Sequence, residues 1–240
     1  MALSLDGPET YHNELRGSQM AFKNVLKAIA SLKKEGVQVN IITTIMKGNL
    51  PLLPEIEKTI STKGVSFWQL QLGIPMGKLS EHMEFVIEPN QLLDVKKFIL
   101  EAKQRNQIQL TIADSIGYCS QDELIMRNNS STNGERVYLG CMAGCKAVAI
   151  ESNGDVKGCL SLQNERFIEG NIRERSLKDI WTDKKSFNYN RNFNSESLGG
   201  YCSKCVYANI CRGGCTSLAY NTSGHINNNN YCMHIMEQRW

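Results

Sequence analysis

The sequence lacks the features of several common protein classes. Its 27 Lys and Arg against 24 Asp and Glu leave a net charge of only +3, without the basic excess typical of nucleic-acid-binding domains. No apolar run reaches the roughly 20 residues that span a bilayer. The opening stretch Met1–Gly7 has no basic segment followed by a long apolar one, so no secretory signal is expected. We therefore predict a cytoplasmic protein that binds neither nucleic acid nor membrane.

Proline and cysteine are both missing from long stretches. No proline follows Pro89 and no cysteine precedes Cys119, whereas eight of the nine cysteines lie between Cys141 and Cys232. Because the cytosol keeps thiols reduced and the count is odd, a disulfide framework is not expected. The C-terminal part also has few large apolar residues per cysteine and lacks the core to fold by burial alone. We expect metal ligation by the cysteines to cross-link it.

Helices and strands alternate over residues 1–113. Strands are predicted at Ala2–Asp6, Val37–Ile45, Val65–Leu72 and Ile108–Ile112, with amphipathic helical patterns between them. Three successive strand–helix–strand units predict parallel pairing, and hence an α/β sheet or barrel. The first strand would leave an open edge, which folded proteins avoid. Either another segment covers this edge or the chain is part of something larger.

The pattern changes after the polar stretch Asn128–Gly134, which marks the best domain boundary. The turn sequence Ser152–Asp155 between two short apolar segments predicts a β-hairpin. A short amphipathic helix is predicted to begin at Ser176. The region beyond residue 137 is therefore expected to be a second, smaller domain.

The clustered cysteines have the spacing C-x3-C-x13-C, then C-x2-C-x5-C-x3-C, then a last cysteine after sixteen residues. Eight cysteines divide into two sites of four, and tetrahedral sulfur ligation suits zinc or an iron–sulfur cluster. Zinc sites favour paired C-x2-C knuckles, and only one such pair occurs. The spacing therefore favours clusters, with a zinc scaffold as the alternative.

At this point the sequence resembles a known family. From Tyr138 to Trp240 it is similar to the SPASM domain, the auxiliary-cluster domain of radical S-adenosylmethionine (SAM) enzymes that modify peptides and proteins. The resemblance is carried by the cysteine spacing together with Gly154, Gly170-Asn171-Ile172, Ile180-Trp181 and Cys211-Arg212-Gly213-Gly214-Cys215. The first half looks like the later part of the radical SAM barrel, through Ser4-Leu5-Asp6-Gly7-Pro8, Leu15-Arg16-Gly17, Thr43-Thr44 and Gln69–Pro75.

The resemblance implies an α/β fold in three segments. Residues 1–113 would be the C-terminal half of a partial (β/α)6 radical SAM barrel. Residues 114–137 would form a linker with a short helix and a polar loop. Residues 138–240 would form a small cysteine-rich SPASM domain with a β-hairpin and short helices.

The resemblance also implies cofactors and their ligands. Two auxiliary [4Fe–4S] clusters would be held by two interleaved sets, Cys141, Cys145, Cys159 and Cys215 for the first, and Cys202, Cys205, Cys211 and Cys232 for the second. Ser4, Arg16 and the backbone near Leu72 match positions that contact SAM, and the Arg16 guanidinium would suit its carboxylate. The catalytic acid and base are not implied.

Two departures from the family limit what the resemblance implies. The C-x3-C-x2-C motif that binds the SAM-cleaving cluster is absent, so we expect this chain to be the C-terminal portion of an enzyme, through truncation, a split gene or decay, and not competent alone. Leu160 stands where sulfatase-maturing relatives have an Asp that acts as the catalytic base, so formylglycine formation is not expected. Modification of a ribosomal peptide or protein fits better, with the auxiliary clusters supporting electron transfer.

The expected partners are a peptide or protein substrate, a separate N-terminal half, and a reductant such as flavodoxin or ferredoxin. The alternative hypothesis is a non-catalytic scaffold or partner module that carries clusters or zinc.

Overall fold

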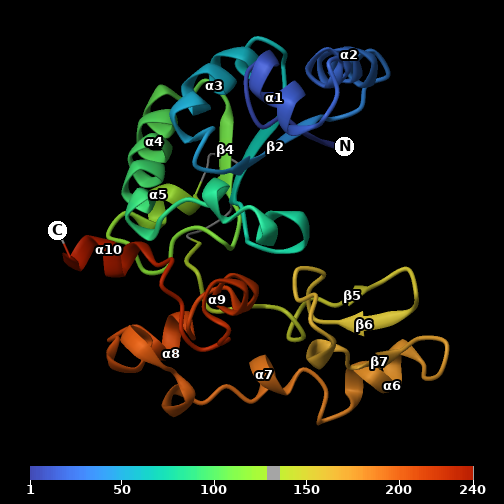
Figure 1. Cartoon of the computed structure of the whole chain (residues 1–240), viewed down its shortest axis with the longest axis vertical. Coiled ribbons are helices and arrows are strands. Elements are labelled where there is room, and N and C mark those ends of the chain that lie inside the picture. The colour runs from blue at the N-terminus through green and yellow to red at the C-terminus, as the bar shows by residue number, and fades with distance from the viewer. Residues whose placement is uncertain (129–135, 240) are drawn as a thin grey trace. The chain divides into compact units, whose positions relative to one another are not determined.

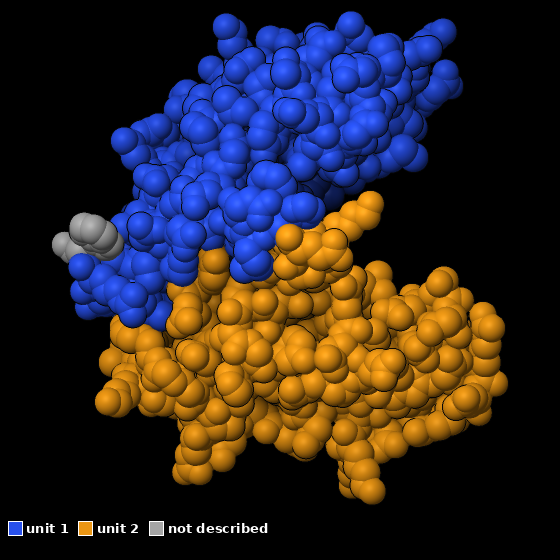
Figure 2. All heavy atoms as spheres, viewed as in Figure 1, with its two compact units in different colours: residues 1–73, 82–137, 232–240 blue, residues 74–81, 138–231 orange. Residues whose placement is uncertain are grey.

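The computed structural model describes residues 1–128 and 136–239, so most of the polar loop predicted at Asn128–Gly134 lies outside the described residues. The chain divides into two compact units, coloured separately in Figure 2. Unit 1 comprises residues 1–73, 82–137 and 232–240. Unit 2 comprises residues 74–81 and 138–231.

Unit 1 is built on a four-stranded parallel sheet in the order β1-β2-β3-β4, of which β2 and β4 are labelled in Figure 1. The strands are β1 (Ala2–Ser4), β2 (Asn40–Ile45), β3 (Phe67–Leu72) and β4 (Gln109–Ile112). The helices are α1 (Glu9–Leu15), α2 (Ala21–Lys34), α3 (Leu53–Ser61), α4 (Leu92–Arg105), α5 (Glu123–Arg127) and α10 (Met233–Arg239), with short 3-10 turns at Leu50–Leu52, Met83–Phe85 and Pro89–Gln91. The predicted α/β class with parallel pairing is confirmed.

Alternation along the two central strands forms the core of unit 1. Every second residue of β2 and of β3 is buried, which is the period of a strand with one face turned inward. Trp68 is fully buried, and its indole N–H donates to Thr43 Oγ1 at 2.8 Å. The apolar ring is therefore removed from water while its one polar group keeps a hydrogen bond. Among the described residues β1 pairs with β2 alone, so it is an edge strand as expected.

The C-terminal helix belongs to unit 1, whereas the sequence grouped residues 232–240 with the cysteine-rich segment. Met233, Ile235 and Met236 of α10 are buried. Glu237 accepts an ion pair from Lys96 Nζ of α4 at 2.6 Å and a hydrogen bond from Ser120. A helix this short carries too little pattern to indicate its packing partner. Residues 74–81, grouped with the barrel by the sequence, cluster with unit 2 and contain the 3-10 turn Gly77–Glu81.

Unit 2 contains a three-stranded antiparallel sheet of β5 (Ala149–Ile150), β6 (Asp155–Lys157) and β7 (Gly170–Asn171). The predicted hairpin turn joins β5 to β6, with Gly154 at a φ of +96° that favours glycine. The predicted helix is α6 (Leu177–Thr182), capped by the Ser176 side chain, which accepts from the Asp179 N–H. The remaining helices are α7 (Asn188–Arg191), α8 (Ala208–Cys211) and α9 (Thr216–Ser223), with 3-10 turns at Glu165–Phe167, Ser195–Ser197 and Gly200–Lys204.

Several apolar side chains of unit 2 are buried. One buried cluster consists of Val156, Ile180 and Phe187, with Trp181 and Tyr189 packed against it, and Leu162, Phe167 and Leu218 are buried as well. The expectation that this part needs cross-linking by its cysteines stays a prediction. Throughout residues 1–128 and 136–239, no helix combines the length and the apolar character needed to cross a membrane.

Candidate functional site

The residues that the sequence assigned to SAM lie along one edge of the sheet of unit 1. Ser4 ends β1 and Leu72 ends β3, and parallel strands present their carboxyl ends at the same edge, where ligands of α/β proteins bind. Ser4 is exposed. Leu72 is buried, and its backbone N–H already donates to Ser115 Oγ at 3.0 Å. Arg16 follows directly after α1.

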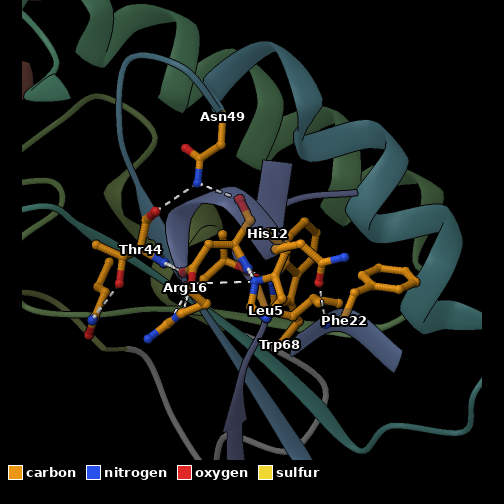
Figure 3. Close-up of polar contacts among 11 residues, drawn as sticks. Leu5, His12, Arg16, Phe22, Thr44, Asn49 and Trp68 are labelled. Carbon is orange, nitrogen blue, oxygen red and sulfur yellow. Dashed lines mark hydrogen bonds and ion pairs between the residues drawn. The ribbon is translucent and has the colours of Figure 1, made fainter. Parts of the chain in front are cut away.

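A buried carboxylate organises this edge. Asp6 is 1% exposed and receives the Arg16 guanidinium through Nε at 3.1 Å and through its terminal nitrogen. The other Asp6 oxygen accepts from the Thr44 backbone N–H of β2 at 2.9 Å. Asp6 therefore joins the end of β1 to β2 and to the residue that follows α1; its partners Arg16 and Thr44 are labelled in Figure 3. The side chain of Arg16 remains 41% exposed, so it has donors left for a ligand.

Two further side chains complete the network, and the sequence did not assign them to the site. His12 of α1 is buried, and its Nδ1 accepts from the Asp6 backbone N–H at 3.1 Å. Burial lowers the pKa of His12, against an opposing effect of the Asp6 charge. Asn49 donates to the carbonyls of Asp6 and Thr44, each at 2.8 Å (Figure 3). A carboxylate directly after a strand was the one signal in the sequence that could have drawn attention to this network.

In unit 2, two cysteine-bearing segments meet at a point with no room for a side chain. Cys141 and Cys145 lie on a tight loop, in which the Cys145 N–H donates to the Met142 carbonyl at 3.0 Å. Gly158 precedes Cys159. A Cβ built on Gly158 would lie 2.8 Å from the Gly144 nitrogen and 2.3 Å from the Tyr189 hydroxyl. Glycine at this position lets the Cys141–Cys145 loop approach Cys159.

Side chains of helix α7 hold the Cys141–Cys145 loop through its backbone carbonyls. Asn190 donates to the Ala143 carbonyl at 2.9 Å, and Arg191 donates to the Gly144 carbonyl at 2.7 Å. The Arg191 guanidinium also lies 4.5 Å from the Trp181 ring centroid and 4.6 Å from that of Phe187. Thr216, next to Cys215, donates to Asn190 Oδ1 at 3.0 Å. α7 therefore ties the loop to the start of α9.

The pKa of Cys215 is affected by two other thiols of its predicted set. Burial raises the pKa of Cys215 to about 12, and the negative charges of Cys141 and Cys159 add to that rise. Neighbouring thiolates repel one another unless a cation offsets their charge, and an iron–sulfur cluster supplies such a charge. Cys145 shares the loop with Cys141.

The second predicted set is divided between the units. Cys202 is buried in the 3-10 turn Gly200–Lys204, where burial, with a smaller effect of Cys205, raises its pKa. Cys211 ends α8, and the next three residues, Arg212 to Gly214, all have positive φ, which turns the chain toward Cys215. Cys232 lies in unit 1, where its thiol donates to the Tyr118 carbonyl at 3.7 Å.

The donor arrangement bears on the choice between zinc and a cluster. Ligand sulfurs lie about 2.3 Å from a zinc ion, so its thiolates converge on one point. In the part of the chain that the structure describes, no three His, Cys, Asp or Glu side chains are arranged to hold a single ion. In a [4Fe–4S] cluster each thiolate binds a different iron, so the two kinds of site require different spacings between the thiols.

Comparison with known proteins matches part of the cysteine-rich region to an iron–sulfur domain. The model of the iron–sulfur cluster-binding SPASM domain matches residues 141–206. The AdoMet-dependent heme synthase of Oleidesulfovibrio alaskensis is 28% identical over 235 residues, covering 93% of this chain and 58% of the relative. The cysteine-type anaerobic sulfatase-maturating enzyme of Clostridium perfringens is 22% identical, with 90% and 57% covered. The chain is a relative of the radical SAM enzymes with a SPASM domain.

The solved structures support the same fold. Streptococcus suis SuiB bound to precursor peptide SuiA matches with a TM-score of 0.69 and 17% identity, over 95% of this chain and 52% of SuiB. The anaerobic sulfatase-maturating enzyme anSMEcpe with bound AdoMet matches with a TM-score of 0.64 and 21% identity, over 99% and 61%. This SPASM-domain chain spans about three fifths of the length of the first curated relatives, 58% and 61%.

His12 predicts a pH dependence of stability. Burial keeps the folded-state pKa of His12 below its ordinary value, so the unfolded chain takes up the proton first as the pH falls. This contribution to stability is complete above the unfolded pKa of about 6.5 and is lost as the pH falls toward the folded pKa. We expect the urea midpoint to decrease over this range, and His12→Gln to reduce the decrease. The matched control His82→Gln, at an exposed histidine, should leave it unchanged; an equal slope in both variants would contradict the role of His12.

Gly158 predicts a steric requirement. The Cβ of Gly158→Ala would meet both Gly144 and Tyr189, so we expect the free energy of unfolding to fall by about 1–3 kcal/mol, the usual cost of overpacking. Gly199→Ala is the control, because its Cβ would meet only Asn228 at 3.8 Å. Urea denaturation of both variants measures the difference. Equal stability of the two would show that the approach at Gly158 is not tight.

Proposed function

We propose that this chain is the C-terminal, cluster-carrying portion of a radical SAM/SPASM enzyme that modifies a peptide or protein. The single observation that supports it most is the close approach at Gly158, which brings the segment of Cys159 to the Cys141–Cys145 loop. The charges of Cys141 and Cys159 also act on Cys215, in line with the first of the two sets that the resemblance implies. The activity, substrate and partners of the whole protein are part of the proposal.

The proposed ligands keep the two sets inferred from the resemblance. Cys141, Cys145, Cys159 and Cys215 would hold the first [4Fe–4S] cluster, and Cys202, Cys205, Cys211 and Cys232 the second. Clusters of this type supply electron uptake or relay when bound. The residues of this chain supply position: Asn190 and Arg191 fix the carbonyls of the first loop, and Gly158 gives it space. Supports behind the ligands set the orientation of the ligands themselves.

The proposed SAM contacts are Ser4, Arg16 and the backbone near Leu72. Arg16 would use donors that Asp6 leaves free, because its guanidinium has five N–H groups in a fixed plane. Asp6 would hold that plane still and so lower the entropic cost of binding a carboxylate. His12 and Asn49 would keep Asp6 in place through hydrogen bonds to its backbone N–H and carbonyl.

The proposed substrate is a peptide or protein, in line with the precursor peptide bound by SuiB. Leu160 is 54% exposed and has no acid–base chemistry, so formylglycine formation is not part of the proposal. The proposed partners are a separate N-terminal half and a reductant such as flavodoxin or ferredoxin. A cytoplasmic location would keep the thiols reduced for cluster ligation.

A tetrapyrrole is the second candidate substrate, and the names of several curated relatives are the observation that favours it. Three curated relatives at 26–28% identity are named AdoMet-dependent heme synthases, and another is named Fe-coproporphyrin III synthase. Titration of the reconstituted chain with Fe-coproporphyrin III would separate the candidates. A saturable change in the Soret band would favour the tetrapyrrole, and no change would favour the peptide.

Anaerobic reconstitution with iron and sulfide tests the proposed clusters. We expect about eight irons per chain with charge-transfer absorption, as two [4Fe–4S] clusters require. Cys215→Ala should lower the count by about half, since it removes one ligand of the first site. Cys119→Ala is the matched control and should keep the full count. Two zinc ions and no iron, or an unchanged count in Cys215→Ala, would overturn the proposal or its ligand sets.

A further inference from the structure

Tyr189 carries one of the buried polar groups of unit 2 whose hydrogen bonding is incomplete. Its hydroxyl is inaccessible to solvent, and the backbone N–H of Gly158 is directed at its oxygen as a donor. Among the described residues no acceptor pairs with the O–H proton. A buried hydroxyl without a partner is costly, so such a group in a folded protein needs an explanation. A missing ligand of the right chemistry is one such explanation.

The position of this hydroxyl indicates which ligand. It lies against the backbone at Gly158, directly before Cys159, and opposite the Cys141–Cys145 loop. The charges of Cys141 and Cys159 both act on it, after that of Glu169. The hydroxyl therefore lies beside the backbone segments that carry Cys159 and the Cys141–Cys145 loop.

The ring of Tyr189 has little freedom to turn away. It packs against the core cluster of Val156, Ile180 and Phe187, and it meets the Phe167 ring edge-on at 5.4 Å and 79°. Its neighbours Asn190 and Arg191 are fixed to the carbonyls of Ala143 and Gly144. The helix that positions the loop therefore also positions the hydroxyl.

We propose that Tyr189 donates a hydrogen bond from its hydroxyl to a sulfur atom of the [4Fe–4S] cluster held by Cys141, Cys145, Cys159 and Cys215, and thereby raises the reduction potential of that cluster. This rests on the proposed function, since it requires the cluster to be bound. The physical reason is electrostatic. One-electron reduction adds negative charge to the cluster, and an O–H dipole directed at a sulfur stabilises the reduced form more than the oxidised form.

The carboxylate of Glu169 is the competing acceptor in the neighbourhood. Burial raises its pKa, and its charge acts on Tyr189 without a hydrogen bond between the two groups. A hydroxyl bonded to Glu169 would leave the cluster unaffected. The two possibilities therefore differ in whether removing the hydroxyl changes the cluster.

The experiment is a redox titration of the reconstituted full chain with dithionite, followed by electron paramagnetic resonance. Tyr189→Phe removes the hydroxyl and keeps the ring. We expect it to lower the reduction potential of one of the two cluster components by about 59 mV. At a fixed applied potential, the ratio of oxidised to reduced cluster would then rise about tenfold. The other component should not move, and the iron content should equal that of the unaltered chain.

Tyr220→Phe is the matched control, because Tyr220 packs edge-on against the same Phe167 ring, at 4.9 Å and 88°. It loses the same atom and should leave both components in place. Equal potentials in Tyr189→Phe and the unaltered chain, with full iron content, would overturn the hydrogen bond while leaving the clusters intact. An unaltered chain that binds no iron would instead overturn the proposed function.

A second measurement covers the case in which Tyr189→Phe does not retain its iron. Resonance Raman spectra of the unaltered chain in H2O and D2O report hydrogen bonds to the cluster through the Fe–S stretching frequencies. A deuterium shift supports a donor at the cluster. Identical spectra in the two solvents would overturn the proposal.

Discussion

At Gly158 two backbone segments come so close that a single Cβ would collide with both Gly144 and Tyr189. The proposed first cysteine site depends on this approach, because Cys141 and Cys145 lie on one segment and Cys159 follows directly on the other. Asn190 and Arg191 hold the contact by donating hydrogen bonds to the carbonyls of the loop. Tyr189, in the same helix, packs against the buried cluster of Val156, Ile180 and Phe187.

In unit 1 the candidate residues are held in position by the sheet and by a polar network. They lie at the ends of parallel strands, whose positions are set by ladder hydrogen bonds and a buried sheet face. The polar contacts are then concentrated on Asp6, which bonds to Arg16, Thr44 and, through its backbone, His12 and Asn49. A fully buried carboxylate is stable only when it is paired in this way. The network therefore fixes Arg16 relative to the strand ends.

The parallel pairing of the strands could be predicted from the sequence, because the alternation of period-2 and helical patterns leaves few topologies. The hairpin at Ser152–Asp155 and the helix after Ser176 were also predictable, since their signals are local. The Asp6 network was not, because it joins residues about forty positions apart that no spacing rule connects. Helix α7 was missed for a similar reason: Asn188–Arg191 is polar and short, and its importance lies in carbonyls of a distant loop.

The two ways of holding a site have different consequences for substitution. At a strand end the backbone is fixed by neighbouring strands, so loss of one side chain such as Ser4 leaves the edge in place. In unit 2 the loop carbonyls of Ala143 and Gly144 depend on two side chains of one helical turn, and Tyr189 of the same turn packs against the buried apolar cluster. A change in α7 therefore reaches the thiols and the buried hydroxyl together. Ligand geometry and the polar surroundings of the site are in this way properties of the same four residues, Asn188–Arg191.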